Sequence, residues 1–243
     1  MPVEYLNVIV ARKKNELKQM KRKKSFKEAL QEEKLTVIGE IKKRSPSKGD
    51  LNAALDPVLL AEQYVKGGAS VISVLTDAAG FGGSLRDLQL IAQQNLGVPL
   101  LRKDFIVDPS QLEESMKAGA DVVLLIVAVL QGQTAEFLKL ATAMGLEALV
   151  EVNTKEELQI AIDAGAELIA VNNRNLHTFE VDLQTAFNLA PLIPQTALKI
   201  AASGIQTAAE ARAFYRAGFH GVLVGETLVK TNNPAALIAE MVQ

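Results

Sequence analysis

Residues 117–127 read Lys-Ala-Gly-Ala-Asp-Val-Val-Leu-Leu-Ile-Val, a helix ending followed directly by an apolar run. The same ending recurs as Lys66-Gly67-Gly68-Ala69, Asp163-Ala164-Gly165-Ala166 and Arg216-Ala217-Gly218-Phe219. A glycine at this place ends a helix in a left-handed turn. Most of the apolar runs lack polar alternation, which is typical of parallel strands that helices cover on their outer side. The recurring pattern predicts a chain built from strand–helix units.

Eight such strands are expected along the chain, and their starts recur every ~20–35 residues, which leaves room for one helix between each pair. They are Thr36–Glu40, Ser70–Leu75, Val98–Arg102, Asp121–Val127, Glu147–Glu151, Glu167–Val171, Ala197–Ala201 and Gly221–Val224. Eight strand–helix units favour a closed (β/α)₈ barrel of the TIM type. The alternative is an open doubly wound sheet, which more often has about five or six strands.

The length of 243 residues and the hydrophobic content of 49% suit one globular domain, residues 1–243. Residues 1–34 precede the first strand and are expected to form a helical extension. Its basic cluster, residues 12–14 and 21–24, is either a targeting or phosphate-backbone patch or the solvated face of a helix. In the second interpretation the other face of that helix is a buried apolar stripe, and this interpretation is favoured because the rest of the chain offsets the charge. That stripe comprises Leu6, Ile9, Val10, Leu17 and Met20.

The composition excludes several classes of function. A net charge of -2 argues against a nucleic-acid footprint. Cysteine is absent, so the chain has no disulfide, thiolate nucleophile or cysteine–zinc site, and two histidines are too few for most zinc sites.

The longest apolar run, Val122 to Leu130, falls well short of the ~20 residues that span a bilayer. With no apolar signal segment, a cytoplasmic enzyme is expected, acting on a small molecule as a monomer or weak oligomer.

Polar side chains appear at the ends of four predicted strands. In a barrel of this kind the chemistry lies at the C-terminal ends of the strands. Period-two alternation places each strand's polar residues on its inward side, so they should converge on one small volume. The convergent set is Glu40, Lys42, Lys103, Glu151, Asn172 and Arg174.

Each of these residues also has a structural interpretation. Glu40 and Lys42 could form a rim ion pair, Lys103 could pair with Asp104, and Glu151 could be a solvated strand end. Taken together these interpretations weaken, because charges inside a barrel mouth carry a desolvation cost that a ligand or a reaction usually requires.

A phosphate site is expected after the last two strands. Ser203-Gly204-Ile205 precedes a helix that begins with a capping box at Thr207 and Glu210, and Val224-Gly225-Glu226 follows the last strand. Small residues there expose backbone N–H groups to an oxyanion, as in the recurrent phosphate site of such barrels. We expect Ser203, Gly204, Gly225 and Glu226 to hold the phosphate through backbone N–H groups, with the Glu226 side chain pointing away.

Several segments in the same order resemble the indole-3-glycerol phosphate synthase family. The similarity covers nearly the whole chain, and its first segment is quite specific. The matching segments are Ile38 to Gly49 (IGEIKKRSPSKG), Leu101 to Val107 (LRKDFIV), Leu149 to Val152 (LVEV), Val171 to Leu176 (VNNRNL), Ser203 to Ile205 and Val224 to Glu226.

The resemblance implies a lyase of tryptophan biosynthesis. Such a carboxy-lyase closes the indole ring of 1-(2-carboxyphenylamino)-1-deoxyribulose 5-phosphate with loss of carbon dioxide and water, and needs no cofactor or metal. It implies that Lys103 is the general acid of ring closure and Glu151 the base of dehydration, with Glu40 as a second acid–base carboxylate. Lys42 and Asn172 complete the catalytic set, anchoring the substrate's anionic groups and hydroxyls. The implied substrate-binding residues are Ser45, Phe81, Phe105 and Arg174, of which Ser45 and Arg174 hold the anthranilate carboxylate.

Two departures from the family pattern stand out. The family usually has a glutamate directly before Ser203, where this chain has Ala202, and a bulkier acidic loop where this chain has Ala78-Ala79-Gly80. These changes leave open a phosphate-sugar-binding barrel of the same family with weakened or altered activity. A further alternative is a phosphate barrel that uses Lys103 or Lys42 as a Schiff-base nucleophile.

Overall fold

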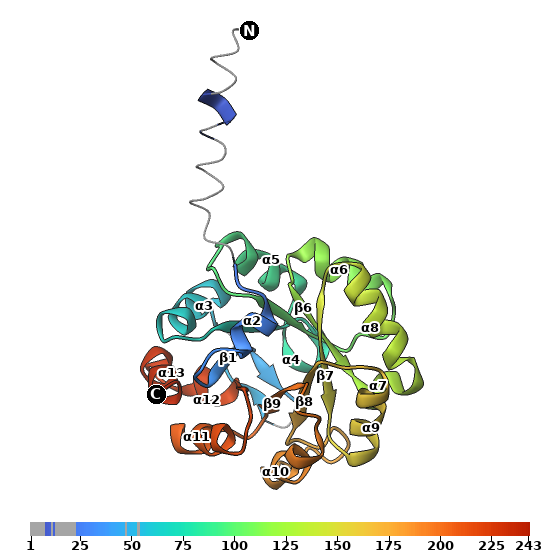
Figure 1. Ribbon diagram of the computed structural model, residues 1–243. Helices are drawn as coiled ribbons and strands as arrows, with labels where there is room; N and C mark the ends of the chain where they lie inside the picture. The colour runs from blue at the N-terminus through green and yellow to red at the C-terminus, as the bar shows by residue number, and fades with distance from the viewer. Residues whose placement is uncertain (1–7, 11, 13–22, 47, 53) are drawn as a thin grey trace.

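The computed structural model describes residues 8–10, 12, 23–46, 48–52 and 54–243. Within them, eight parallel strands close into a barrel in the order β1-β10-β9-β8-β7-β6-β5-β4. Helices surround the strands in a ring (Figure 1). The predicted (β/α)₈ barrel is therefore confirmed, and the open sheet is excluded because β1 pairs with both β10 and β4.

The barrel strands match the eight predicted runs to within one or two residues at each end. They are β1 Thr36–Ile41, β4 Val71–Leu75, β5 Leu100–Lys103, β6 Val122–Ile126, β7 Glu147–Val152, β8 Leu168–Asn172, β9 Leu198–Ala202 and β10 Gly221–Val224. The start predicted at Val98 is two residues early, because Pro99 has no backbone N–H to join the ladder.

The outer helices follow the strands in sequence order. They are α3 Pro57–Lys66, α4 Ala78–Phe81, α5 Leu85–Gln93, α6 Ser110–Ala118, α7 Val127–Leu130, α8 Thr134–Ala143, α9 Lys155–Asp163, α10 Gln184–Leu189, α11 Ala208–Arg216, α12 Glu226–Lys230 and α13 Pro234–Met241. Short 3₁₀ turns, Gln131–Gln133 and Ala190–Leu192, precede α8 and follow α10. The predicted left-handed turns are present, with φ between 77° and 101° at Gly68, Gly119, Gly165 and Gly218.

Two layers of buried residues hold the barrel together. Outward-facing strand residues such as Val37, Val123 and Val150 pack against the helices in one cluster. Inward-facing residues such as Ile38, Leu101 and Leu149 form a second cluster inside the barrel. The alternation that assigned polar residues to the inward side is thus observed throughout the strands.

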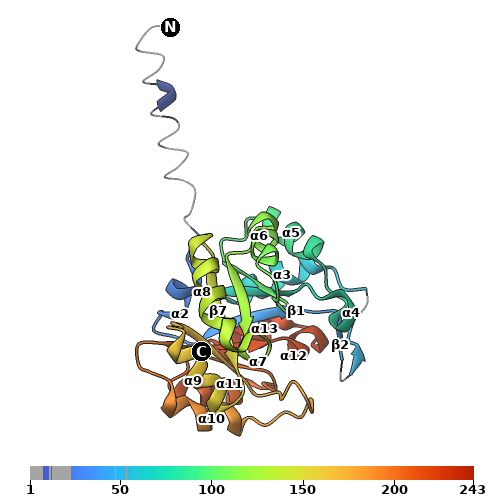
Figure 2. The same ribbon diagram turned by 90° about the vertical axis from the view of Figure 1, so that its right-hand side faces the viewer.

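A short helix, α2 Phe26–Leu30, closes one end of the barrel. Phe26, Ala29 and Leu30 are buried within the inner cluster. The backbone N–H groups of Phe26 and Lys27 donate to the Glu147 carboxylate at 2.6 and 2.9 Å. Figure 2 shows α2 at one end of the strands and α4 and β2 at the other.

The N-terminal helical extension remains a prediction for most of residues 1–34. Leu6, Leu17 and Met20 of the predicted stripe, and most of the basic cluster, lie outside the described residues. Val10 is 40% exposed, so the burial predicted for it is wrong.

A small hairpin after β1 was not predicted from the sequence. Strand β2 Arg44–Ser45 pairs antiparallel with β3 Gly49–Asp50. The Arg44 Nε donates to Asp50 at 2.8 Å, and the backbone oxygen of Lys43 accepts from Leu51 at 2.9 Å. This hairpin lies at the end of the barrel opposite α2.

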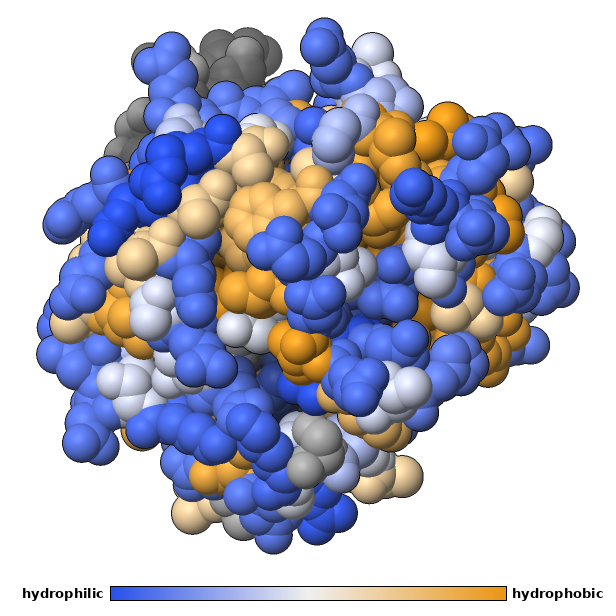
Figure 3. Space-filling model, turned by 90° about the horizontal axis from the view of Figure 1, so that it is seen from below, coloured by the Kyte–Doolittle hydropathy of each residue, from blue (hydrophilic) through white to orange (hydrophobic). Residues whose placement is uncertain are grey.

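The surface in the space-filling view is mainly hydrophilic, with the hydrophobic residues in separate groups (Figure 3). No helix within the described residues combines the length and the apolar character that crossing a membrane requires.

Candidate active site

A cavity of about 300 Å³ opens at the C-terminal ends of the barrel strands. It brings together all nine residues that the sequence assigned to catalysis and substrate binding. They are Glu40, Lys42, Ser45, Phe81, Lys103, Phe105, Glu151, Asn172 and Arg174. The convergence follows from the strand register, since Glu40, Lys103, Glu151 and Asn172 each end the inward row of a different strand.

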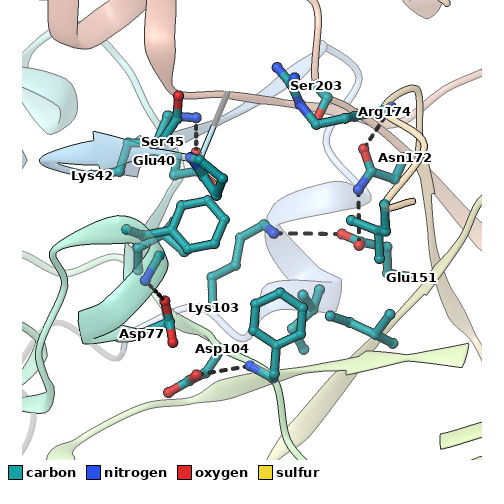
Figure 4. Close-up of a pocket in the computed structure, with 18 of the residues that line it drawn as sticks. Glu40, Lys42, Ser45, Asp77, Lys103, Asp104, Glu151, Asn172, Arg174 and Ser203 are labelled. Atoms are coloured by element: carbon teal, nitrogen blue, oxygen red, sulfur yellow. Dashed lines mark hydrogen bonds and ion pairs between the residues drawn. The ribbon is translucent and has the colours of Figure 1, made fainter. Parts of the chain in front are cut away.

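Lys103 and Glu151 face one another across the cavity floor (Figure 4). The Lys103 Nζ lies 3.6 Å from the Glu151 Oε2, an ion pair that is longer than a hydrogen bond. Asn172 orients the other carboxylate oxygen, because its Nδ2 donates to Glu151 Oε1 at 3.0 Å. Its own Oδ1 accepts from the Arg174 backbone N–H at 3.0 Å. A chain of contacts from β8 therefore fixes the Glu151 carboxylate opposite the ammonium.

Glu40 and Lys42 form a second pair on the adjoining wall. The Lys42 Nζ lies 2.8 Å from Glu40 Oε1, and the side chains are only 15% and 5% exposed. A β-carbon at position 225 would overlap the Glu40 carboxylate, so the glycine there makes room for it. The Glu40 backbone oxygen also accepts from the Tyr64 hydroxyl.

The structural interpretations of these charges are mostly wrong. Asp104 does not pair with Lys103, because its Oδ2 accepts from Arg102 at 3.0 Å and from Thr76 at 2.5 Å. Glu151 is 2% exposed and so is not a solvated strand end. Glu40 and Lys42 do form an ion pair, but inside the mouth rather than on an exposed rim. The mouth thus carries buried charge on two carboxylates.

The mutual arrangement of the charges sets their protonation. Burial alone would raise the pKa of Glu40, but the charges of Lys42, Lys103 and Arg174 outweigh it and lower the pKa. Burial alone would lower the pKa of Lys103, but the charges of Glu151 and Glu40 raise it above its ordinary value. Ionised carboxylate and charged ammonium are therefore both stable at neutral pH.

Part of the cavity wall is apolar. The rings of Phe81 and Phe105 lie 6.4 Å apart with planes tilted by 34°, and Leu124 and Ile126 line the wall beside them. Asp77 holds the turn that presents Phe81, because its side chain accepts from the Gly80 backbone N–H. A flat aromatic group fits between such walls.

A second, more open pocket of about 720 Å³ adjoins the first and shares Glu40, Lys42, Arg174, Phe179 and Ser203 with it. All four residues predicted for phosphate binding line it: Ser203, Gly204, Gly225 and Glu226. Ser203 and Gly204 both have left-handed backbones, with φ of 68° and 83°. The shared residues make the two pockets parts of one continuous site.

Several residues of this site escaped the sequence interpretation. Lys48 and Lys230 line the second pocket, and Phe179 lines both. Lys48 lies inside the first segment that resembles the family. Its side chain reaches the pocket because Lys48 lies in the turn of the β2–β3 hairpin, which the sequence did not predict. Buried Asn173 was missed because it faces away from the cavity, behind Ser203.

His220 is not among the residues that line either pocket. His220 accepts from the Lys199 backbone N–H through Nδ1 at 3.0 Å, and burial together with the charge of Lys199 lowers its pKa. It lies before β10, at the end opposite the cavity. In the described part of the chain, no group of three or more histidine, aspartate or glutamate side chains is placed to hold a metal ion.

Comparison with known proteins shows the family to which the chain belongs. A sequence profile described as indole-3-glycerol phosphate synthase matches residues 3–241. The chain is 51% identical to a protein of that name from Kineococcus radiotolerans, over 85% of this chain and 75% of the relative. It is 48% identical to the one from Rhodococcus jostii, over 88% of this chain and 80% of the relative.

Solved structures support the fold alone. 3-Hexulose-6-phosphate synthase from Salmonella typhimurium superposes with a TM-score of 0.69 at 15% identity, covering 85% of this chain and 96% of that chain. The tryptophan synthase alpha chain from Legionella pneumophila gives a TM-score of 0.61 at 16% identity, covering 86% and 90%. On the sequence match and the shared motifs, the chain belongs to the indole-3-glycerol phosphate synthase family.

Proposed function

We propose that this chain is an indole-3-glycerol phosphate synthase acting on 1-(2-carboxyphenylamino)-1-deoxyribulose 5-phosphate in the cytoplasm, in tryptophan biosynthesis. The single observation that carries the residue roles is the opposition of Lys103 and Glu151 across a cavity with one aromatic wall. A proton donor and a proton acceptor then lie next to one another in the cavity, where both can reach a bound sugar chain.

Ring closure begins when the aromatic carbon attacks the ribulose carbonyl carbon. Lys103 donates a proton to the carbonyl oxygen as that carbon–carbon bond forms. The carboxylate then leaves as carbon dioxide, and its bonding electrons restore the aromatic ring. Since the neighbouring carboxylates raise the Lys103 pKa, the ammonium is available as an acid at neutral pH.

Dehydration completes the indole. Glu151 removes a proton from the ring closure product, and the hydroxyl formed from the carbonyl leaves as water after taking up a proton. The ionised Glu40 carboxylate lies 2.8 Å from the Lys42 ammonium and so can relay a proton from Lys42 to the leaving hydroxyl. Asn172 keeps the Glu151 carboxylate in place and holds the substrate hydroxyls.

Binding uses both pockets of the site. Arg174 and Ser45 hold the anthranilate carboxylate, while Phe81 and Phe105 face the aromatic ring. The phosphate lies on the backbone N–H groups of Ser203, Gly204, Gly225 and Glu226. Lys42 lines both pockets and so can contact anionic groups at either end.

Lys103→Met tests the central role. The variant should fold normally and lose ~10²–10⁴-fold in turnover, because a positioned general acid contributes about that much. Indole-glycerol phosphate formation is followed by fluorescence and folding by circular dichroism. Lys117→Met, an exposed lysine on α6 with 71% of its side chain accessible, is the control and should retain full activity. A Lys103→Met enzyme with more than a tenth of the parent rate would contradict the assignment.

A Schiff-base mechanism is the alternative for the same lysine. It needs a neutral amine, whereas Glu151 and Glu40 raise the Lys103 pKa and so stabilise the ammonium. Borohydride treatment during turnover should therefore trap no substrate adduct on Lys103 or Lys42. A trapped adduct located by mass spectrometry would favour the Schiff base, and product binding without turnover would favour a weakened family member.

A further inference from the structure

Glu226 is an unexpected residue on a phosphate pocket, because a carboxylate repels a bound phosphate. It begins α12 and lines the second pocket beside Gly225. Its side chain is 21% exposed, so it contacts both protein and solvent. A backbone role for residue 226 needs no particular side chain, which leaves this carboxylate without a function.

Two lysines converge on the same oxygen of Glu226. The Nζ atoms of Lys48 and Lys230 both lie 2.7 Å from Oε1. Lys48 comes from the β2–β3 hairpin and Lys230 from the last turn of α12, so the carboxylate bridges two elements. Partial burial would raise the pKa of Glu226, but hydrogen bonds from Lys230 and Lys48 lower it to about 2. The carboxylate is therefore ionised throughout the working range of pH.

Both lysines also line the phosphate pocket. A phosphomonoester carries close to two negative charges at neutral pH and accepts charge-assisted hydrogen bonds. It would compete with the Glu226 carboxylate for the same two ammonium groups. The carboxylate cancels half of the positive charge that the lysines bring to the pocket.

We propose that Lys48 and Lys230 are phosphate-binding side chains and that Glu226 is their counter-ion, which bound phosphate displaces. In this arrangement Glu226 weakens phosphate affinity and so limits how tightly a phosphorylated product is held. The proposal rests on the phosphate subsite of the proposed function, but it concerns the strength of binding rather than the ring-closing chemistry.

Binding of inorganic phosphate and of glycerol phosphate, measured by calorimetry on the full chain, tests the proposal without turnover. Glu226→Gln should tighten binding of either probe roughly threefold to tenfold, the size of one partly screened charge–charge interaction. Lys48→Gln and Lys230→Gln should each weaken it by a similar factor. These effects should shrink at high salt, because exposed charges are screened.

Glu113→Gln is the matched control for net charge. Glu113 pairs with Lys117 on α6 at 3.3 Å, exposed and outside both pockets, so its substitution should leave phosphate affinity unchanged. Thermal unfolding of each variant checks that the fold is retained.

The outcomes separate this inference from the proposed function. If the parent turns over substrate but Glu226→Gln binds phosphate no more tightly than Glu113→Gln, the counter-ion role is overturned. Weaker binding by Glu226→Gln would also overturn it and assign the carboxylate to ordering the loop. A parent that binds phosphate, tightened by Glu226→Gln, but forms no indole-glycerol phosphate would instead contradict the proposed function alone.

Discussion

Glu40 influences the mouth through charge as well as through contact. It lies 2.8 Å from Lys42, and its charge also helps to raise the pKa of Lys103. Burial acts on Lys103 in the opposite direction, so the carboxylates are what keep the buried ammonium protonated. At the scale of one residue, Glu40 therefore stabilises the ammonium of Lys103, the proposed general acid, even where it does not transfer a proton itself.

Glu40→Gln should shift the alkaline limb of the pH–rate profile. Lys103, the proposed general acid, must be protonated, and removing one of the charges that raise its pKa lets burial lower that pKa. In the parent, activity should persist above pH 10.5, the ordinary pKa of lysine. In Glu40→Gln, activity should be lost at a lower pH. The measurement is kcat/KM as a function of pH for the parent and the variant. The test is the pH at which the alkaline limb falls, not the lower maximal rate expected of the variant. An unmoved limb, with Glu113→Gln as the charge control, would mean that Lys103 is not the group titrating.

Ala202 is the departure from the family pattern that is easiest to test. It ends the inward row of β9 after Leu198 and Ile200, and is 2% exposed within the inner cluster. It is paired in register with Asn172 and Leu223, directly beside the site. The cavity that its neighbour Asn172 lines also carries Lys42, Lys103 and Arg174, so we expect a carboxylate at residue 202 to interact with positive charge.

We expect Ala202→Glu to raise kcat/KM by about tenfold or more, because one oriented charged hydrogen bond contributes roughly 1.5–3 kcal/mol. Steady-state kinetics with the anthranilate–ribulose phosphate measure it. Ala202→Gln is the matched variant, of similar size but uncharged, and should gain less. If Ala202→Glu folds normally and its activity stays level or falls, the Ala78–Gly80 loop has remodelled the site so that it no longer uses this carboxylate.

Among the elements, the end of β8 and the proposed phosphate loop after β9 are joined by Asn173. Its side chain is buried between the end of β8 and α10, and its Nδ2 donates to the Ser203 backbone oxygen at 3.1 Å. Its Oδ1 accepts from the Ala186 backbone N–H at 3.1 Å. A β-carbon on Gly204 would collide with Val181 of the same β8–α10 segment. The left-handed backbone at residues 203 and 204 is therefore held from the β8 side.

Asn173→Ala should weaken substrate binding more than it slows the chemical step. The substitution leaves the Ser203 oxygen and the Ala186 N–H unpaired, at roughly 1–3 kcal/mol each. We expect KM and the dissociation constant of inorganic phosphate to rise about tenfold, with a smaller change in kcat. Asn175→Ala, on the same segment, is the control, since its side chain accepts from the His177 and Thr178 backbone N–H groups of its own loop. Equal effects of the two substitutions on phosphate affinity would contradict the special role of Asn173.

At the scale of elements, the sequence predicted those strands and helices whose residues recur with a regular period. The strands and their inward-facing residues were predictable because a barrel strand is buried on both faces. Its sequence is therefore an apolar run that ends in polar residues at the mouth, as at Leu149 and Glu151. The β2–β3 hairpin was not, because two-residue strands have no period. Lys48 and Asn173 were missed for a related reason: their partners, Glu226 and Ser203, lie on other loops, and such pairings depend on the fold.

Across the whole molecule, the two ends of the barrel have separate tasks. The end with α4 and β2 carries the buried charges of the site, whereas α2 closes the other end with apolar side chains (Figure 2). The inner cluster, including Leu149 and Ile200, fills the barrel between them. In such barrels the C-terminal end of the strands serves catalysis and the N-terminal end serves stability.

Phe26→Ala should lower stability without altering the chemistry. The side chain is fully buried against the inner cluster, and truncating a buried phenylalanine costs about 3–5 kcal/mol. In a chain of this length each kcal/mol lowers Tm by ~2–4 °C, so Tm should fall by roughly 6–20 °C. Leu59→Ala, at a side chain 57% exposed on α3, is the control and should barely change Tm. Well below the transition, kcat of Phe26→Ala should stay within about twofold of the parent, because the inner cluster separates residue 26 from Lys103 and Glu151. A folded Phe26→Ala enzyme with a kcat reduced tenfold would show that packing at the closed end controls the geometry of the mouth.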